Sequence, residues 1–234
     1  MAFMRKDIRN QSDEALHSRK PVARDYLILL HTPSFVLNTL GMASMTFAVG
    51  GIAFWMPHYI VEYRKYSTLP TVNLVFGGIT VVAGILATLS GGWAGDKLLK
   101  KYSGAYFIVS GVAMLIAFPL LLLMLKVPFP WGYMVLFAAV FCLFFNTGPT
   151  NAALANVTHT SMRVTAFSIN IFIIHLFGDA ISPPLIGRMS DRHGMNFAFT
   201  VVSVLVLVGG IFWLLAAQHL EEDTAKAPHR LPMT

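Results

Sequence analysis

Two ionisable residues, His175 and Asp179, lie inside an apolar run that is long enough to cross a membrane. They are four residues apart, so in a helix their side chains share a face. Ionisable side chains at membrane depth are costly and often mark an ion or proton pathway. The pair therefore predicts a proton or cation site. The alternative is a permanent His–Asp hydrogen bond that only fixes the packing of helices.

Polar residues in three other places could belong to the same pathway. Asn146 and Thr150 are four residues apart and share a helix face, with Asn151 beside them. Asn170 precedes His175, and Asn38 lies in the first apolar run. Such amides can hydrogen bond across helices or line a wet cavity, and the sequence leaves both roles open. The glycines of the first run, Gly41, Gly50 and Gly51, are expected to allow close helix packing.

A short motif of Gly, three residues, Asp and a basic residue occurs twice. Gly92 and Gly187 are 95 residues apart, as are Asp96 and Asp191, and each copy follows a long apolar run. An acid at a helix end can pair with backbone amides or with a basic side chain of a neighbouring helix in one conformation only. We therefore expect conformational clasps at these motifs, formed by Gly92, Asp96, Lys97, Gly187, Asp191 and Arg192.

Prolines interrupt four of the apolar runs, with Pro57 near the end of the first and Pro119 in the third. Pro149 lies in the fourth run, and Pro183 and Pro184 lie in the fifth. A proline inside a helix removes one backbone hydrogen bond and bends the helix. These positions are candidate hinges around a cavity, although a purely structural kink is the alternative at each.

Six apolar runs are available to position these residues. Hydrophobic residues make up 56% of the chain and charged residues only 12%, which is typical of a membrane protein. The runs are 34–59, 71–94, 103–125, 131–154, 164–186 and 196–219. About twenty residues of helix cross the hydrocarbon layer, and strands of a barrel would alternate in polarity. We predict an all-α integral membrane protein with a polar tail or linker at 1–32, six spans within 33–219 and a tail at 220–234.

The distribution of cations predicts how the spans are oriented. An even number of spans places both termini on one side, and positive charge favours the cytoplasm. With the termini inside, the outer segments hold Arg64, Lys65, Lys126, Arg188 and Arg192, which leaves 12 of the 17 Lys and Arg residues inside. Both tails are then cytoplasmic, Asp96 is inside and Asp191 is outside. This arrangement predicts a 3+3 inverted repeat, which is common in secondary transporters.

Several other functional classes find no support in the sequence. The net charge of +6 is not arranged as a basic stripe with interleaved aromatic residues, so nucleic acid is not an expected partner. Hydrolase, phosphate-loop and zinc-protease motifs do not occur, and Ser110 with His175 makes only a weak case for an intramembrane protease. The single cysteine, Cys142, has no partner for a disulfide or a metal cluster. We expect no catalytic residue, metal or cofactor.

Specific segments resemble the C-terminal half of a major facilitator superfamily transporter, and more narrowly the spinster family. The matching segments run from Pro33-Ser34-Phe35-Val36-Leu37 to Trp55-Met56-Pro57, over Gly91-Gly92-Trp93-Ala94-Gly95-Asp96, and from His175-Leu176-Phe177-Gly178-Asp179 to Ser190-Asp191. The resemblance implies transport of an amphipathic lipid, with proton coupling. It also implies twelve spans, whereas this chain has six, and the acid and arginine of the family's first half have no counterpart here.

These observations together predict half of a transporter. We expect alternating access by a complete transporter in the cell membrane, with the bilayer, a small-molecule or lipid substrate and a second six-span half as partners. That half could be a missing N-terminal half or another protomer, since the chain could be a fragment, a split gene product or a self-pairing half. The alternative is a truncated membrane protein that transports nothing and binds or regulates a full-length relative.

Overall fold

The computed structural model describes Val22 and residues 26–230. Most of the predicted N-terminal tail, residues 1–21 and 23–25, and the last residues, 231–234, lie outside the described residues. The part of the chain that the structure describes is helical and contains no strand. This agrees with the all-α class predicted from the apolar runs.

Six helical segments are long and apolar enough to span a membrane: 33–63, 69–99, 105–124, 132–156, 160–193 and 195–216. A short helix, α2 (Leu27–Leu30), precedes them. The first three spans are α3 (Pro33–His58) with the π-helix η2 (Tyr59–Tyr63), α4 (Leu69–Leu99) and α5 (Ala105–Met124). The last three are α6 (Gly132–Phe144) with α7 (Thr147–Asn156), then α8 (Arg163–Ile174), η4 (His175–Asp179) and α9 (Ser182–His193), and finally α10 (Met195–Ala216). The six-span prediction is confirmed.

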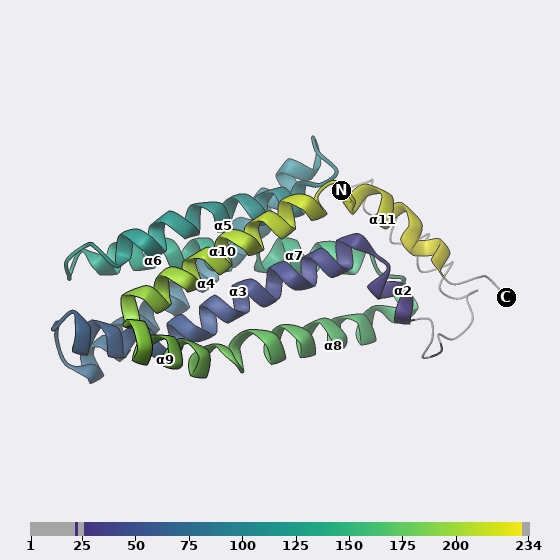
Figure 1. Cartoon of the computed structure of the whole chain (residues 1–234). Helices are drawn as coiled ribbons and strands as arrows, with labels where there is room; N and C mark the ends of the chain where they lie inside the picture. Colours follow the sequence, from purple (N-terminus) through teal and green to yellow (C-terminus); the bar gives the residue numbers. More distant parts are fainter. Residues whose placement is uncertain (1–21, 23–25, 231–234) are drawn as a thin grey trace.

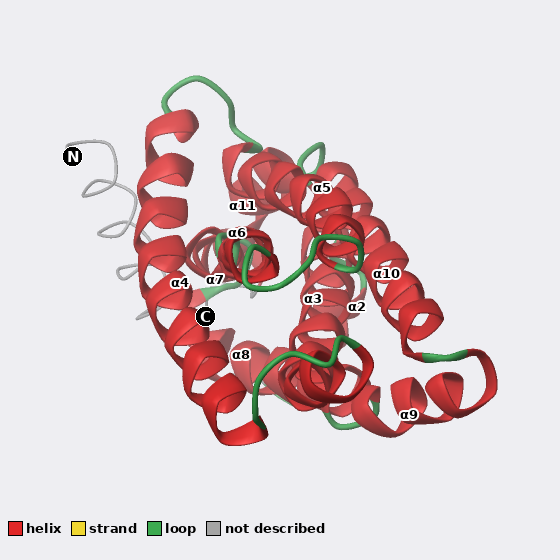
Figure 2. Ribbon diagram, turned by 90° about the vertical axis from the view of Figure 1, so that its left-hand side faces the viewer, coloured by secondary structure: helices red, strands yellow, loops and turns green. Residues whose placement is uncertain are grey.

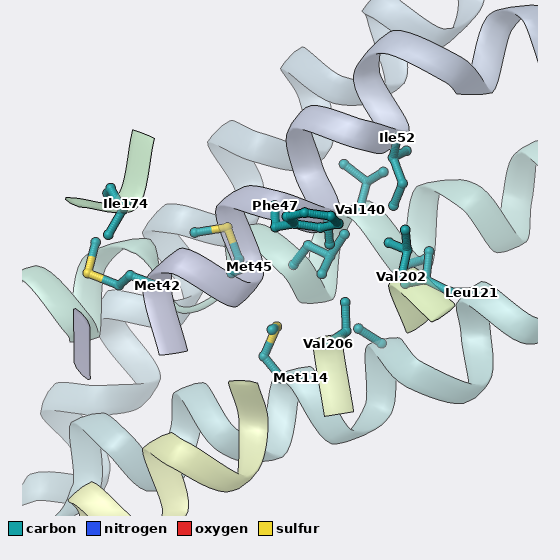
Figure 3. Packing of buried hydrophobic residues seen from close by; sticks show 14 of the residues in the cluster. Met42, Met45, Phe47, Ile52, Met114, Leu121, Val140, Ile174, Val202 and Val206 are labelled. Carbon is teal, nitrogen blue, oxygen red and sulfur yellow. The ribbon is translucent and has the colours of Figure 1, made fainter. Parts of the chain in front are cut away.

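The spans form one bundle in which the last span lies against the first and the third (Figure 1). α10 packs along α3 and α5, while α6 packs between α4 and α5. The fifth span packs on α3, on the far side from α5, and α8 runs along the lower side of the bundle in Figure 1. Figure 2 shows α4 at the edge of the bundle. Methionine, phenylalanine and branched aliphatic side chains fill the interior, among them Met45, Phe47 and Met114 (Figure 3).

The fourth span is broken at Phe145 and Asn146. Pro149 has no backbone N–H, so the carbonyl of Phe145 loses the donor that a regular helix would provide. That carbonyl lies against Gly91 of α4, where an added Cβ would be only 1.8 Å from the Phe145 oxygen. The bend at Pro149 and the glycine on α4 therefore fit each other and allow the two helices to touch.

Arg64 holds the loops at one end of the bundle together. Its guanidinium donates to the carbonyls of Leu125 and Val127, the latter at 2.7 Å, and lies over the ring of Phe129. Nearby, the Tyr59 hydroxyl donates to Asn196 at 2.7 Å. The connections after the first and third spans and the start of the last span are thus joined by side chains.

The segment expected to be a C-terminal tail includes a docked helix, α11 (Leu220–Lys226), followed by η5 (Ala227–Arg230). Asp223 accepts a 2.9 Å hydrogen bond from the backbone N–H of Ser34, at the start of α3. Arg230 pairs with Asp223 at 3.2 Å and donates to Thr32, and both charged side chains are less than 10% exposed. The predicted cytoplasmic location of this segment remains a prediction.

We expect Asp223→Asn to loosen the attachment of α11 and to lower the free energy of unfolding by about 1–3 kcal/mol. The substitution leaves Arg230 buried without its counterion, but the terminal segment can detach, which limits the loss. Chemical unfolding in detergent and hydrogen exchange at residues 32–36 would measure it. Glu222→Gln is the matched control, because Glu222 is exposed and pairs with Lys226 on the surface. Equal effects of the two substitutions would contradict a role for the buried pair.

Candidate functional site

The fifth span is interrupted where the sequence places its ionisable pair. The π-helix η4 covers His175–Asp179, and Gly178 has non-helical dihedral angles of φ −95° and ψ −105°. Pro183 and Pro184 follow in the first turn of α9, and since neither has an N–H, the carbonyls of Asp179 and Ala180 lack their usual helical donors. π-Bulges of this kind are frequent at functional sites.

His175 and Asp179 contact each other as their spacing predicts. His175 Nδ1 lies 3.0 Å from both carboxylate oxygens of Asp179. The side chains are 57% and 40% exposed, respectively, so both can be reached from outside the bundle. A carboxylate and an imidazole at this distance can share a proton or hold a cationic group.

The pair lies in an open groove of about 1020 Å³ between α3 and the fifth span. Apolar side chains dominate the lining, and among the residues that the structure describes, His175 and Asp179 are its only ionisable groups. The lining is formed by Gly50, Ala53, Phe54, Ser168, Ile171, Phe172, His175, Leu176, Asp179, Ala180 and Pro183. The groove can therefore accept an apolar chain and offers a polar group one place to bind.

Close packing against α3 fixes the position of Asp179. An added Cβ on Gly50 would lie 2.4 Å from the Asp179 Cβ, and one on Gly178 would lie 2.8 Å from the Thr46 Cβ. The expectation that the first-run glycines allow close packing is met at Gly50 and also at Gly51, which faces Ile186. A side chain at residue 50 would displace Asp179 from the groove.

Two further residues that sequence reasoning missed belong to this region. Trp55 donates its indole N–H to the carbonyl of Pro183 at 2.9 Å and ties α9 to α3. Ser182 has a buried hydroxyl, close to Gly50 and Gly51, that finds no hydrogen-bond partner within the described part of the chain. The sequence offered two indications of their importance: Trp55 lies in a segment that resembles the spinster family, and Ser182 directly precedes two prolines. Their contacts could not be predicted, because they depend on how α3 and α9 cross.

The buried amides predicted for the pathway lie outside the groove. Asn38 receives a 2.9 Å hydrogen bond from Trp213 and donates to the carbonyl of Thr150 at 3.3 Å. Asn170 accepts from Thr39 at 2.8 Å. In this conformation these bonds join the first, fourth, fifth and sixth spans, and a role in the pathway remains a prediction.

The side chains of the other predicted pathway residues form their hydrogen bonds within the fourth span. Asn146 is fully buried and donates to the carbonyl of Leu143, and its own side-chain oxygen has no partner among residues 26–230 or Val22. Thr150 donates to the Asn146 carbonyl at 2.8 Å, as their shared face predicts. Asn151 donates to the Thr147 carbonyl at 2.8 Å. The break in this span, beside the candidate hinge Pro149, places these polar groups together.

Both Gly-x-x-x-Asp motifs lie in the last turns of helices, α4 and α9. Asp96 accepts a 2.8 Å hydrogen bond from the Tyr106 hydroxyl of α5, and in the described part of the chain no backbone amide or basic side chain donates to it. Lys97 lies over the ring of Trp93, at 4.8 Å from its centre. Gly187 faces Trp55, where a Cβ would be 2.9 Å away, and Asp191 and Arg192 are exposed. Their action as clasps remains a prediction.

Comparison with known proteins identifies relatives of this chain. Residues 2–178 match the Major Facilitator Superfamily. Protein spinster homolog 1 of Xenopus tropicalis is 30% identical over 87% of this chain and 44% of its own length. The sphingosine-1-phosphate transporter SPNS2 of Mus musculus is 28% identical over 92% of this chain and 44% of its own. This chain thus spans about half the length of these relatives.

A solved structure shows the same fold. A bacterial homolog of the human lysosomal transporter spinster, in an inward-facing and unoccupied conformation, superposes with a TM-score of 0.73 at 16% identity. The match covers 88% of this chain and 52% of that chain. The predicted resemblance to spinster proteins is confirmed, and the chain belongs to the Major Facilitator Superfamily.

Proposed function

We propose that this chain is the C-terminal six-span half of a secondary transporter that carries an amphipathic, lipid-like or organic solute by alternating access, coupled to protons. The observation that carries the proposal is the His175–Asp179 pair in an open, mainly apolar groove at a break in the fifth span. Relatives that are named as spinster proteins and as sphingosine-1-phosphate transporters support the substrate class.

A second six-span half would complete the transporter. The fifth span and α4 are each only 22% buried over their most apolar windows, whereas the first span is 61% buried. These two spans therefore present surface that lipid or another bundle must cover. We infer that the partner half covers the fifth span, because the exposed side of this span carries His175 and Asp179, which lipid would solvate poorly. The two three-span units would form an inverted repeat in the cell membrane, with both termini cytoplasmic.

The fifth span is built to move in two parts. Asn170 binds α8 to Thr39 of α3, while Trp55 separately binds α9 to α3 through the Pro183 carbonyl. Between these attachments lies η4, which packs on α3, and at this break η4 and the prolines leave few regular helical bonds to resist bending. A proton or a substrate group that displaces His175 from Asp179 would release the contact that spans this break. Bending there would change access to the groove from either side.

Transport by reconstituted protein tests the proposal. We expect the purified chain alone to take up no lysolipid into proteoliposomes, and co-expression with an N-terminal half of a spinster relative to restore uptake that a pH gradient drives. The groove of this chain is open on one side, so a monomer offers no closed path. Uptake by the monomer would refute the need for a second half, and uptake by a homodimer would identify that half as another copy.

A non-transporting role, in which this six-span unit binds or regulates a full-length relative, is the second candidate. A truncated half would bind a full-length relative without completing a pathway. Co-purification with a full-length relative, together with no restored uptake by any matching half, would support this role and contradict the transporter.

A further inference from the structure

One face of α4 bears a continuous stripe that changes from apolar to basic along the helix. Successive members are three or four residues apart and therefore lie on one side of the helix. The apolar part is 49–69% exposed. We call this the α4 stripe, and it consists of Val82, Leu86, Leu89, Trp93, Lys97 and Lys100, with Lys101 directly after it.

The basic end of the stripe is free to bind an anion. Lys97, Lys100 and Lys101 are exposed, and none of them forms an ion pair among the residues that the structure describes. The nearest acid along the helix, Asp96, is engaged by the Tyr106 hydroxyl at 2.8 Å. The Lys97 ammonium lies 4.8 Å from the centre of the Trp93 ring, which holds one cation beside an aromatic residue that is 65% exposed.

We propose that the α4 stripe binds an anionic phospholipid, with the phosphate on the three lysines and an acyl chain along Leu89, Leu86 and Val82. The rise from Val82 to Trp93 is about 17 Å, close to one leaflet of a ~30 Å hydrocarbon layer. Tryptophan is favoured where hydrocarbon meets head groups. The order of acyl-binding, aromatic and cationic residues along α4 therefore matches the order of parts in one lipid molecule.

Several features favour a lipid over a protein partner on this face. The apolar part of the stripe has no polar side chain, in contrast to the exposed face of the fifth span with Ser168, His175 and Asp179. Three cations at one helix end attract an anionic head group, and each lysine near such a surface contributes about a fivefold factor in binding.

Native mass spectrometry of the full chain in detergent would test the proposal. Phosphatidylglycerol and phosphatidylcholine of matched acyl chains are titrated separately, and bound lipids are counted. We expect the protein to retain phosphatidylglycerol preferentially. Replacing Lys97, Lys100 and Lys101 together by Gln should weaken phosphatidylglycerol binding by about tenfold or more and leave phosphatidylcholine binding unchanged. The same three positions replaced by Arg should keep the preference.

The matched control removes three cations elsewhere. Lys65, Lys126 and Arg188 are exposed and lie outside the stripe, so their combined replacement by Gln should leave the preference intact. Thermal unfolding of each variant reports whether it is folded, and the single substitutions Lys97→Gln, Lys100→Gln and Lys101→Gln supply the answer if the triple Gln variant is not. Equal binding of the two lipids, equal losses in both triple variants, or full competition by inorganic phosphate would overturn the proposal.

Discussion

Gly91→Ala is expected to lower the free energy of unfolding by about 3 kcal/mol, because the new methyl group would lie 1.8 Å from the Phe145 oxygen. The obstructing atom belongs to the backbone, so no rotation of a side chain can remove the clash. α4 would have to move away from the break in the fourth span, which would open the packing around Asn146 and Pro149. Unfolding by denaturant in detergent would measure the loss.

The adjacent glycine on the same helix provides the control for this substitution. At Gly92 an added Cβ meets nothing within 4 Å, so Gly92→Ala should be neutral or slightly stabilising in a helix. The two variants add the same methyl group to neighbouring positions. If both unfold like the wild type, α4 and the fourth span do not cross as closely as the structure shows.

Asp179→Asn in the complete transporter is expected to abolish uptake driven by a pH gradient while substrate exchange continues. Asparagine keeps the shape and the hydrogen bond to His175 but cannot exchange a proton near neutral pH. Folding should be retained, since an exposed pair of this kind stabilises a protein by only about 0–1 kcal/mol. Uptake into proteoliposomes across a range of pH, with thermal unfolding of each variant, would measure both effects.

Two further variants separate coupling from packing. His175→Gln should shift the pH optimum by a smaller amount, because the carboxylate remains in the groove and no other ionisable residue of the described part of the chain lines it. Glu62→Gln is the control, since Glu62 lies on the surface near Lys65, outside the groove. An unchanged pH profile for Asp179→Asn would eliminate the coupling role, and unfolding of that variant would favour a packing role.

The six spans could be predicted because bilayer thickness imposes a length and a polarity that each segment shows by itself. The break in the fourth span shows only partly in the sequence: Pro149 marks the bend, but its tight fit depends on Gly91, more than fifty residues earlier. The docking of α11 could not be predicted from the local sequence, because an aspartate usually lies on the surface. The burial of Asp223 depends on its contacts with Ser34 and Arg230 in the folded chain.

The candidate site could likewise be predicted from the sequence only in part. The contact between His175 and Asp179 follows from a spacing of four residues and needed no tertiary information. The groove beside them depends on Gly50 approaching Asp179 from another span, and the exclusion of Asn38 and Asn170 from it depends on which partners the folded bundle provides. Sequence thus identified the ionisable groups and could not say which buried amides had already been satisfied by helix packing.

The packing of α10 against α3 has a consequence for biosynthesis. Asn38 enters the membrane with the first span, but its partner Trp213 is 175 residues further along the chain. Throughout the synthesis of the intervening spans, this amide lacks its permanent hydrogen-bond partner. The insertion machinery, water or a transient neighbour must shelter it until the last span arrives. Ribosome-bound chains that end before residue 213 should therefore be the ones most exposed to quality-control proteases.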